Sequence, residues 1–495
     1  MAKQRSFVNA VKWAYTGTWG ERGISSLVAV VVAAILGPDV FGMVSVAIVY
    51  VAILQAFLDQ GLLAALVQKK ELDDDHLNSV FWTNQALGVV LLAAGLLLAR
   101  WWAAENHAPA AASFISALSF DIPIMALSIA HFAILKRELN FKTISIISNI
   151  SAASGGLVGI GMAVAGLGAW SLIGLQLTKD GVSTVLAWRT GAWRPKQRFS
   201  WRHLRELLDF SIAHFFAQLG ILSGSQATSV ALGIFFGPLA LGLYRIAERF
   251  MNSVVAMSTS AVQMVAFSQF SRHQDDREAI RSSAITCLRI TADITLPALA
   301  GLAAVSTPLM AMLGARWLPA APVLKILCAL GVAIVFSYFT GPLLQALSRP
   351  RQGAILEWGA AVVAVAALFL VAWSVRHGST ELQIIAVAAA RLAAFAILVT
   401  PFFLVILMRI CGISMRELAR AIAPAALSAA SVIAAVSGLA RSEWLSSGPV
   451  VVLLGAEVAV GGALGIAVLL TVETQMRRSV FNALGLTVYQ SSGAK

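Results

Sequence analysis

Apolar and polar positions alternate along this chain in long blocks. Runs of about 20 apolar residues, the length that a helix needs to cross a bilayer, follow one another between short polar loops. Because backbone groups in lipid must satisfy their hydrogen bonds within the segment, these runs predict helices and not open strands. The predicted spans are 11–36, 40–66, 77–98, 114–134, 143–164, 169–188, 207–236, 239–268, 285–310, 321–346, 355–374, 382–408, 418–438 and 449–471.

The pattern predicts an all-α integral membrane protein with about 14 transmembrane helices. Composition agrees, because 59% of the residues are hydrophobic and only 12% are charged. No soluble domain interrupts the apolar runs, so little room remains for an active site outside the bilayer. We therefore expect a transporter and not an enzyme, and we predict no catalytic residues.

The charged residues are distributed unevenly between the loops. The chain carries 36 Lys and Arg against 24 Asp and Glu, a net charge of +12. With the N-terminus in the cytoplasm and a change of side at each span, about 25 basic residues lie inside and about four outside. This positive-inside bias predicts cytoplasmic N- and C-termini, and it accounts for the basic charge without a nucleic-acid partner.

A short motif occurs twice, 200 residues apart: Gly37–Gly42 reads GPDVFG, and Gly237–Gly242 reads GPLALG. Each copy alone predicts a tight turn with proline opening the next helix. Their equal spacing predicts two homologous six-helix lobes with two further helices appended. Parallel repeats of this kind enclose a substrate site at their interface. The predicted parts are an N-terminal lobe (1–188), a basic cytoplasmic linker with an interfacial helix (189–206), a C-terminal lobe (207–408), and the last two helices with a cytoplasmic tail (409–495).

Cationic side chains at membrane depth are the candidates for substrate binding. Arg22 lies near the middle of the first span and Lys179 near the middle of the sixth, while Arg245 and Arg249 lie one turn apart on the eighth. Ionisable groups are costly at this depth, so each one suggests a function. The planar guanidinium of arginine holds phosphate by two hydrogen bonds. These four residues therefore predict a site for a phosphorylated anion.

Local ion pairing is the alternative explanation for these cations. Nine acidic residues also lie within the predicted spans. Arg245 has Glu248 one turn away, and Asp180 directly follows Lys179. Arg391 would pair with Glu457 if the twelfth and fourteenth spans touch.

Two of the buried acids are candidates for ion coupling. Asp59 interrupts an apolar run and predicts either a proton or sodium site or a hydrogen bond between helices, and Glu21 adjoins Arg22. No His or Cys spacing predicts a metal site, and no phosphate loop predicts ATP hydrolysis. We therefore expect neither a metal nor a cofactor.

The basic linker carries a short amphipathic pattern. Trp201, Leu204, Leu207 and Leu208 fall on one helical face beside arginines. Such a helix is expected to lie in the interface against anionic lipid. The alternatives are a charged topological anchor and a docking site for a cytoplasmic glycosyltransferase.

Several motifs, taken in order along the chain, resemble a known family. They are Gly37–Gly42, Asp59–Leu62, Phe81–Asn84, Lys136–Lys142, Ala240–Tyr244 and Arg316–Pro322. Over nearly its full length the chain resembles the Wzx-type flippases, the polysaccharide-transport branch of the multidrug/oligosaccharidyl-lipid/polysaccharide exporter superfamily. Arg249 matches the usual basic position on the eighth helix. Thr228 and Ser229 stand where many relatives carry an Asp-Arg pair, so no role of that pair is carried over.

The resemblance implies a bacterial inner-membrane protein. Its substrate would be an undecaprenyl-diphosphate-linked oligosaccharide, moved from the cytoplasmic to the outer leaflet for exopolysaccharide, capsule or O-antigen synthesis. Transport would be coupled to an ion gradient by alternating access. The expected partners are the polyprenyl-diphosphate-linked glycan and the lipid bilayer, and the resemblance leaves room for other polysaccharide-assembly proteins.

Three other functions compete with this interpretation. A peptidoglycan-precursor flippase also has fourteen helices, whereas a drug antiporter of the same superfamily usually has twelve. A membrane polymerase or ligase, from another class, needs a sizeable outside loop with catalytic side chains. The longest predicted outside loop, Arg100–Ser113, offers only Glu105 and His107 beside Arg100.

Overall fold

The computed structural model describes residues 2–58, 61–69, 71–272, 276–340, 343–344, 350–440 and 450–472, and the elements that it shows there are all helical. In chain order they are α1 (Ala2–Leu36), α2 (Pro38–Leu58), α3 (Leu62–Gln68), α4 (Asp74–Glu105), α5 (Ala111–Ser119), α6 (Asp121–Ala126), α7 (Ile129–Arg137), α8 (Phe141–Val164), α9 (Trp170–Thr190), α10 (Trp201–Arg272), α11 (Arg277–Ala304), α12 (Ser306–Leu313), η1 (Ala315–Trp317), α13 (Ala320–Ser337), α15 (Pro350–Ser374), α16 (Thr380–Ala393), η2 (Ala394–Val399), α17 (Thr400–Cys411), α18 (Met415–Ala440) and α20 (Val450–Val472).

The helices confirm an all-α, multi-pass membrane architecture. Within the described residues, 10 helices are long and apolar enough to span a bilayer, or 11 if the bent pair Ala111–Ala126 and Ile129–Arg137 is one span. One of these candidates, Gln218–Thr259, is kinked at Gly237 and covers parts of two predicted spans. Helix α9, which carries Lys179 and Asp180 at its centre, is not among the candidates. The number of 14 spans is not confirmed and stays a prediction.

The chain divides into two compact units. The first comprises residues 1–249, 313–320 and 354–391, and the second comprises 250–312, 321–353 and 392–495. The sequence boundaries of the two lobes, with a linker at 189–206, stay a prediction.

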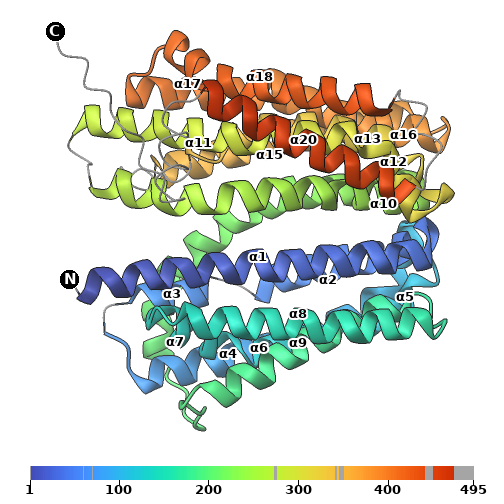
Figure 1. Ribbon diagram of the computed structural model, residues 1–495. Helices are drawn as coiled ribbons and strands as arrows, with labels where there is room; N and C mark the ends of the chain where they lie inside the picture. The colour runs from blue at the N-terminus through green and yellow to red at the C-terminus, as the bar shows by residue number, and fades with distance from the viewer. Residues whose placement is uncertain are drawn as a thin grey trace. The chain divides into compact units, whose positions relative to one another are not determined.

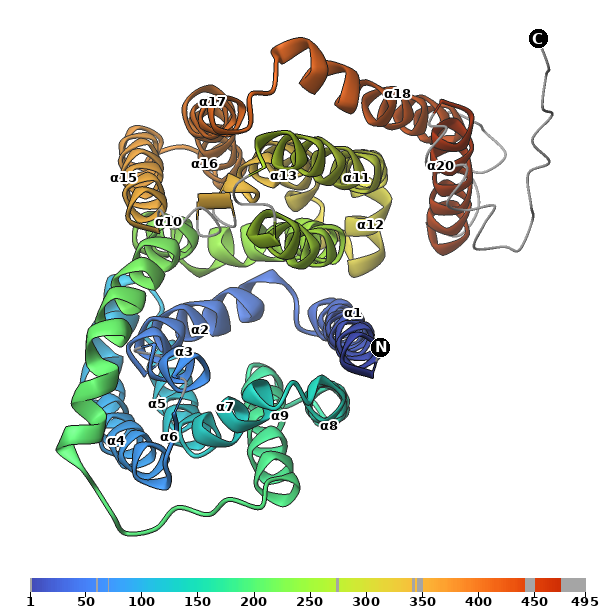
Figure 2. The same cartoon turned by 90° about the vertical axis from the view of Figure 1, so that its left-hand side faces the viewer.

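In the first unit, α1 runs beside α8, and α8 runs beside α9 (Figure 1). The short helices α5 and α6 pack against α2, α4 and α9, as Figure 2 shows from the end of the helices. Small residues allow this close packing: a methyl group at Gly155 of α8 would overlap the Leu175 carbonyl and the Cβ of Lys179 on α9. The glycines therefore set how close Lys179 comes to α8.

The two Gly-Pro motifs form matching turns. Gly37 has φ 78° and Gly237 has φ 79°, a left-handed conformation that glycine adopts without strain. Each turn is followed by a helix that begins at proline, although α10 continues through its turn. The turns bring Gly42 and Gly242 together: a methyl group at either would overlap the carbonyl oxygen of Pro238 or Pro38, respectively, in the other copy. This reciprocal contact is what a two-fold axis between repeats produces.

In the second unit, α11 packs along α18, and α18 packs along α20 (Figure 1). The core includes Leu288, Phe339 and Leu407, which are almost fully buried. The polar end of α11 is tied to α18 by an ion pair of Arg281 with Glu417.

The linker helix packs against protein on much of its apolar face. Leu204 and Leu207 are 3% and 2% exposed and lie in a cluster with Leu62, Leu66 and other residues. Only Trp201, which is 61% exposed, stands clear of that cluster. The apolar leucines that we expected to face lipid therefore hold the linker to α3 and its neighbours.

Candidate functional site

Lys179 pairs with an acid on another helix. Its Nζ lies 2.9 Å from Oε1 of Glu21 on α1, and the two side chains are 28% and 32% exposed. The neighbouring Asp180 instead accepts a hydrogen bond of 2.6 Å from Gln176 Nε2. The structure therefore joins two predicted site residues, Lys179 and Glu21, although they were assigned to substrate binding and ion coupling.

Arg249 reaches the same helix. Its guanidinium Nη2 donates a hydrogen bond of 2.9 Å to the carbonyl oxygen of Ser25, three residues after Arg22 on α1. Both Arg22 and Arg249 are exposed. Arg249 and Lys179 therefore both contact the stretch of α1 that carries Arg22, within the first unit.

Arg245 belongs to a more buried network. Its Nη1 lies 3.6 Å from Oε2 of Glu248, as the helical spacing suggested, and 3.4 Å from the Ser229 hydroxyl. Glu248, only 4% exposed, also pairs with Arg391 of α16 at 2.5 Å. Arg391 in turn donates to the Tyr244 hydroxyl at 3.1 Å. The acid partner of Arg391 is therefore Glu248, where the sequence had suggested Glu457.

The arginines on α10 thus differ in their surroundings. The side chain of Arg245 is 23% exposed and is engaged by Glu248 and Ser229. Arg249, one turn further, is exposed and donates a hydrogen bond to the Ser25 carbonyl. The more exposed Arg249 is therefore the more accessible of the two arginines, whereas Arg245 is held by Glu248.

The remaining predicted residue, Asp59, lies outside the described residues. The sequence missed a different acidic group in the first unit, in which Asp121 of α6 meets Asp180 of α9. Both residues were visible as acids within apolar spans. Only the packing of α6 against α9 brings them together.

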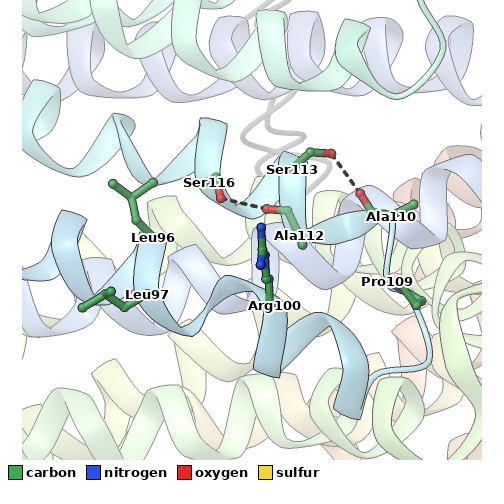
Figure 3. Close-up of a pocket in the computed structure, with 8 residues that line it drawn as sticks. All are labelled: Leu96, Leu97, Arg100, Pro109, Ala110, Ala112, Ser113 and Ser116. Atoms are coloured by element: carbon green, nitrogen blue, oxygen red, sulfur yellow. Dashed lines mark hydrogen bonds between the residues drawn. The ribbon is translucent and has the colours of Figure 1, made fainter.

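A hollow of about 650 Å³ opens at the end of α4 and the start of α5. Figure 3 shows Arg100 beside the hollow, with Ser113 and Ser116 hydrogen-bonded to carbonyls of α5 and the residue before it. Arg100 is the only ionisable residue in its lining. The hollow contains none of the predicted site residues.

The second unit holds an apolar groove of about 450 Å³ between α11, α18 and α20. Its lining is formed by aliphatic side chains and glycines, together with two carboxyls, Asp293 and Glu457. A methyl group at Gly462 would meet open space there. Neither Asp293 nor Glu457 was predicted as a site residue.

One group of possible metal ligands lies at the start of α4. The side-chain ligand atoms of Asp73, His76 and His203 lie within 4.8 Å of one another. Both His76 nitrogens are already occupied: Nδ1 accepts from the Asp73 backbone N–H, and Nε2 lies 3.3 Å from Glu206. The group is therefore explained as a helix cap joined to the linker helix.

Glu206 of the linker helix forms the ionic contacts of this helix cap. Lys69 Nζ lies 2.5 Å from its Oε2. Hydrogen bonds from Lys69 and His76 lower the pKa of Glu206 to about 2, since both favour the charged carboxylate.

Residues 31–322 match the family described as "Polysaccharide biosynthesis protein". The chain belongs to this family. Among its relatives is the succinoglycan biosynthesis transport protein ExoT of Rhizobium meliloti (strain 1021), which is 29% identical over 371 residues, 74% of each chain. The lipopolysaccharide biosynthesis protein WzxC of Escherichia coli (strain K12) is 25% identical over 356 residues, covering 70% of this chain and 72% of WzxC.

Solved structures show the same fold. The lipid II flippase MurJ in an inward closed conformation matches with a TM-score of 0.73 at 14% identity, over 94% of this chain and 98% of that one. An inward-facing multidrug resistance MATE transporter of the MOP superfamily matches with a TM-score of 0.58 at 14% identity, over 82% and 96%. These matches confirm the fold that the sequence resemblance implied.

Proposed function

We propose that this protein is a flippase for a lipid-linked oligosaccharide, working in a bacterial inner membrane with both termini in the cytoplasm. Its substrate would be an undecaprenyl-diphosphate-linked repeat unit bound for exopolysaccharide, capsule or O-antigen. The transport and polysaccharide roles in the names of ExoT and WzxC support this assignment. The fold shared with MurJ is suited to moving a lipid-linked cargo.

The observation that carries the proposal is the group of cations along α1. A diphosphate cannot enter hydrocarbon without partners, because burying an unpaired charge is prohibitive. Arg22 and Arg249 are exposed and reach the same stretch of α1. Lys179 is held beside them by Glu21. We assign diphosphate binding to these three residues, with Arg245 supporting α10 through Glu248.

Glu21 takes a different role from the one that its position in the sequence suggested. A carboxylate 2.9 Å from an ammonium orients that ammonium and offsets its charge. We therefore assign Glu21 to positioning Lys179. Ion coupling by Asp59 stays a prediction.

The alternative within the superfamily is a peptidoglycan-precursor flippase, which the high TM-score to MurJ favours. Both substrates are lipid diphosphates, so the same cations would serve either one. A deletion strain separates the alternatives. Repeat units of a surface polysaccharide trapped on the cytoplasmic leaflet support the proposal, whereas trapped peptidoglycan precursor supports the alternative.

The experiment extracts polyprenyl-linked sugars from the deletion strain and probes spheroplasts with a lectin for the outer leaflet. Complementation with wild type should restore outward exposure, and Arg249→Ala should reduce it tenfold or more, as loss of a charge-assisted contact of about 1.5–3 kcal/mol predicts. Arg100→Ala is the matched control, since Arg100 lies in the hollow beside α4. Repeat units that reach the outer leaflet without this protein would refute the proposal.

A further inference from the structure

The loop between α9 and α10 is held against the first turns of α4. Residues 191–200 form no helix and run from α9 past the end of α4 to α10 (Figure 2). The backbone N–H of Lys196 donates a hydrogen bond of 2.8 Å to Asn78 Oδ1, and that of Ser200 donates one of 2.9 Å to Ser79 Oγ. Because the backbone is fixed at both positions, the side chains between them project from a set place on the first unit.

Arginines and large aromatic side chains are exposed on this loop and on the first turns of α10. Phe199 is 55% exposed and Trp201 is 61% exposed. Arg198, Arg202 and Arg205 are exposed as well, and we call these five residues the linker surface. The leucines at the start of α10 pack against α3 and its neighbours, whereas the two aromatic rings stay outside that cluster. Exposed apolar groups that are rimmed by charges mark sites of interaction with a membrane or another protein.

The positive charge of the linker surface is only partly neutralised. Arg202 Nε lies 3.7 Å from Glu206 Oε1, and the Arg202 side chain is 86% exposed. Within the part of the chain that the structure describes, Arg198 and Arg205 form no ion pair. The neighbouring ion pairs use lysines: Lys196 with Asp74 at 2.8 Å, and Lys69 with Glu206 at 2.5 Å. The linker surface therefore keeps enough positive charge to bind an anion.

The exposed side of α10 continues from the linker surface into the predicted span 207–236. Ile212 is 51% exposed and Phe216 is 56% exposed, and both lie within that span. They share one helical face with Trp201 and Arg205, because spacings of four and seven residues nearly complete whole turns. Trp201 lies six residues before the span, about 9 Å at 1.5 Å per residue, which is close to the depth of the lipid headgroups. A face that passes from exposed apolar side chains to arginines fits a membrane better than a soluble protein partner.

We propose that the linker surface binds the headgroup of an anionic phospholipid in the adjoining leaflet, which is the cytoplasmic leaflet in the proposed topology. The guanidinium groups of Arg198 and Arg205 hydrogen-bond the phosphate oxygens, since their fork of donors matches a phosphate group. The rings of Phe199 and Trp201 lie at the boundary between headgroups and acyl chains, as aromatic side chains do on interfacial helices. This phospholipid is bound and not transported, so the site differs from the cations along α1.

The first test counts the phospholipids that the protein retains. Purified full-length protein in detergent is incubated with equal amounts of phosphatidylglycerol and phosphatidylcholine, and native mass spectrometry identifies the bound lipid. Wild type should retain phosphatidylglycerol in preference to phosphatidylcholine. The triple variant Arg198→Gln/Arg202→Gln/Arg205→Gln should weaken this retention at least tenfold, because each arginine near anionic headgroups changes the affinity about fivefold. Retention equal to that of wild type overturns the proposal and leaves the surface to a protein partner.

The matched control removes three exposed arginines from the second unit. Arg409 of α17 and Arg416 and Arg420 of α18 are exposed, and the positive-inside pattern places them on the same side of the membrane. The variant Arg409→Gln/Arg416→Gln/Arg420→Gln should retain phosphatidylglycerol as wild type does. Equal losses in the two triple variants overturn the proposal, because they would show a general attraction between basic protein and anionic lipid.

A second variant tests the aromatic side chains without changing the charge. In Phe199→Ser/Trp201→Ser the arginines remain, and retention of phosphatidylglycerol should fall severalfold because the rings no longer enter the interface. Both residues are exposed, so the variant should fold, and size-exclusion profiles check this. Unchanged retention in this folded variant overturns the assignment of the surface to a membrane.

A bound lipid should also stabilise the protein. The linker surface depends on the contacts between the loop and α4, so a lipid that binds it favours the folded state. Phosphatidylglycerol should raise the thermal midpoint of wild type more than that of the first triple variant, and equal shifts contradict the proposal. Neither test uses a glycan. Lipid retention in a protein that moves no repeat units therefore refutes the flippase function alone, and glycan transport without lipid retention refutes the lipid site alone.

Discussion

The buried network around Glu248 gives the sharpest test of the structure. Glu248 pairs with Arg391 at 2.5 Å and with Arg245 at 3.6 Å. Glu248→Gln would therefore leave two guanidinium groups without their carboxylate. Removing one partner from a buried ion pair costs about 3–5 kcal/mol, so we expect a loss of stability in that range.

Replacing Arg391 should lower the stability of the protein less than replacing Glu248. In Arg391→Met, Glu248 keeps Arg245, and the main loss is the Arg391 packing and its hydrogen bond to Tyr244. We expect about 1–3 kcal/mol. The double variant Glu248→Gln/Arg391→Met removes one of the two stranded charges and should be more stable than Glu248→Gln alone, a coupling of about 0.5–3 kcal/mol.

The assay heats detergent-solubilised protein and measures the fraction that remains monodisperse on size exclusion. The midpoint temperature should be highest for wild type and next highest for Arg391→Met. The double variant should equal Arg391→Met within error or lie below it, and Glu248→Gln should have the lowest midpoint. Arg100→Met is the control for loss of an exposed arginine. A midpoint for Arg391→Met as low as that of Glu248→Gln would refute the reasoning, because it would mean that Arg245 does not support Glu248.

Three other predictions follow from the described contacts. Gly42→Ala should lower stability by several kcal/mol or prevent folding, because the added methyl group overlaps the Pro238 carbonyl. Gly23→Ala is the control, because its methyl group meets open space, and thermal midpoints compare the two variants. Lys179→Met should reduce the outward exposure of repeat units tenfold or more in the lectin assay, whereas the control Lys325→Met should not. Equal effects of the two substitutions would contradict a specific role for Lys179. The lowered pKa of Glu206 means that its ion pair stabilises the fold above about pH 4.5 and that this stabilisation is lost as pH falls toward about 2. In a curve of stability against pH, Glu206→Gln should therefore reduce the loss of stability on the acid side. An unchanged acid side would contradict the assignment.

Apolar runs predicted where the helices lie, because the length and hydropathy of each run are local properties. They did not establish the number of crossings. The sequence 207–268 reads as two spans separated by Gly237-Pro238, and in the structure α10 consists of two helices joined at a kink, where Gly237 has non-helical backbone angles. The pair Arg245–Glu248 was also predictable, since residues three apart on a helix are neighbours.

Contacts between helices were not predictable in the same way. Which acid meets Arg391 depends on how α16 and α10 are rotated about their axes, and the sequence offered Glu457 as readily as Glu248. The same limit hid the meeting of Asp121 with Asp180 and the partner of Lys179. Charge and depth identified the residues that need partners, and only the packing identified the partners.

The reciprocal contact of Gly42 and Gly242 has a consequence for how such proteins diversify. Two positions 200 residues apart obey a single steric condition, since each glycine leaves room for the backbone of the other copy. The atoms nearest to each glycine are backbone atoms of the other copy, and these are the same whatever sugar is carried. Side chains elsewhere in the protein can therefore change while this contact between the two Gly-Pro motifs stays the same.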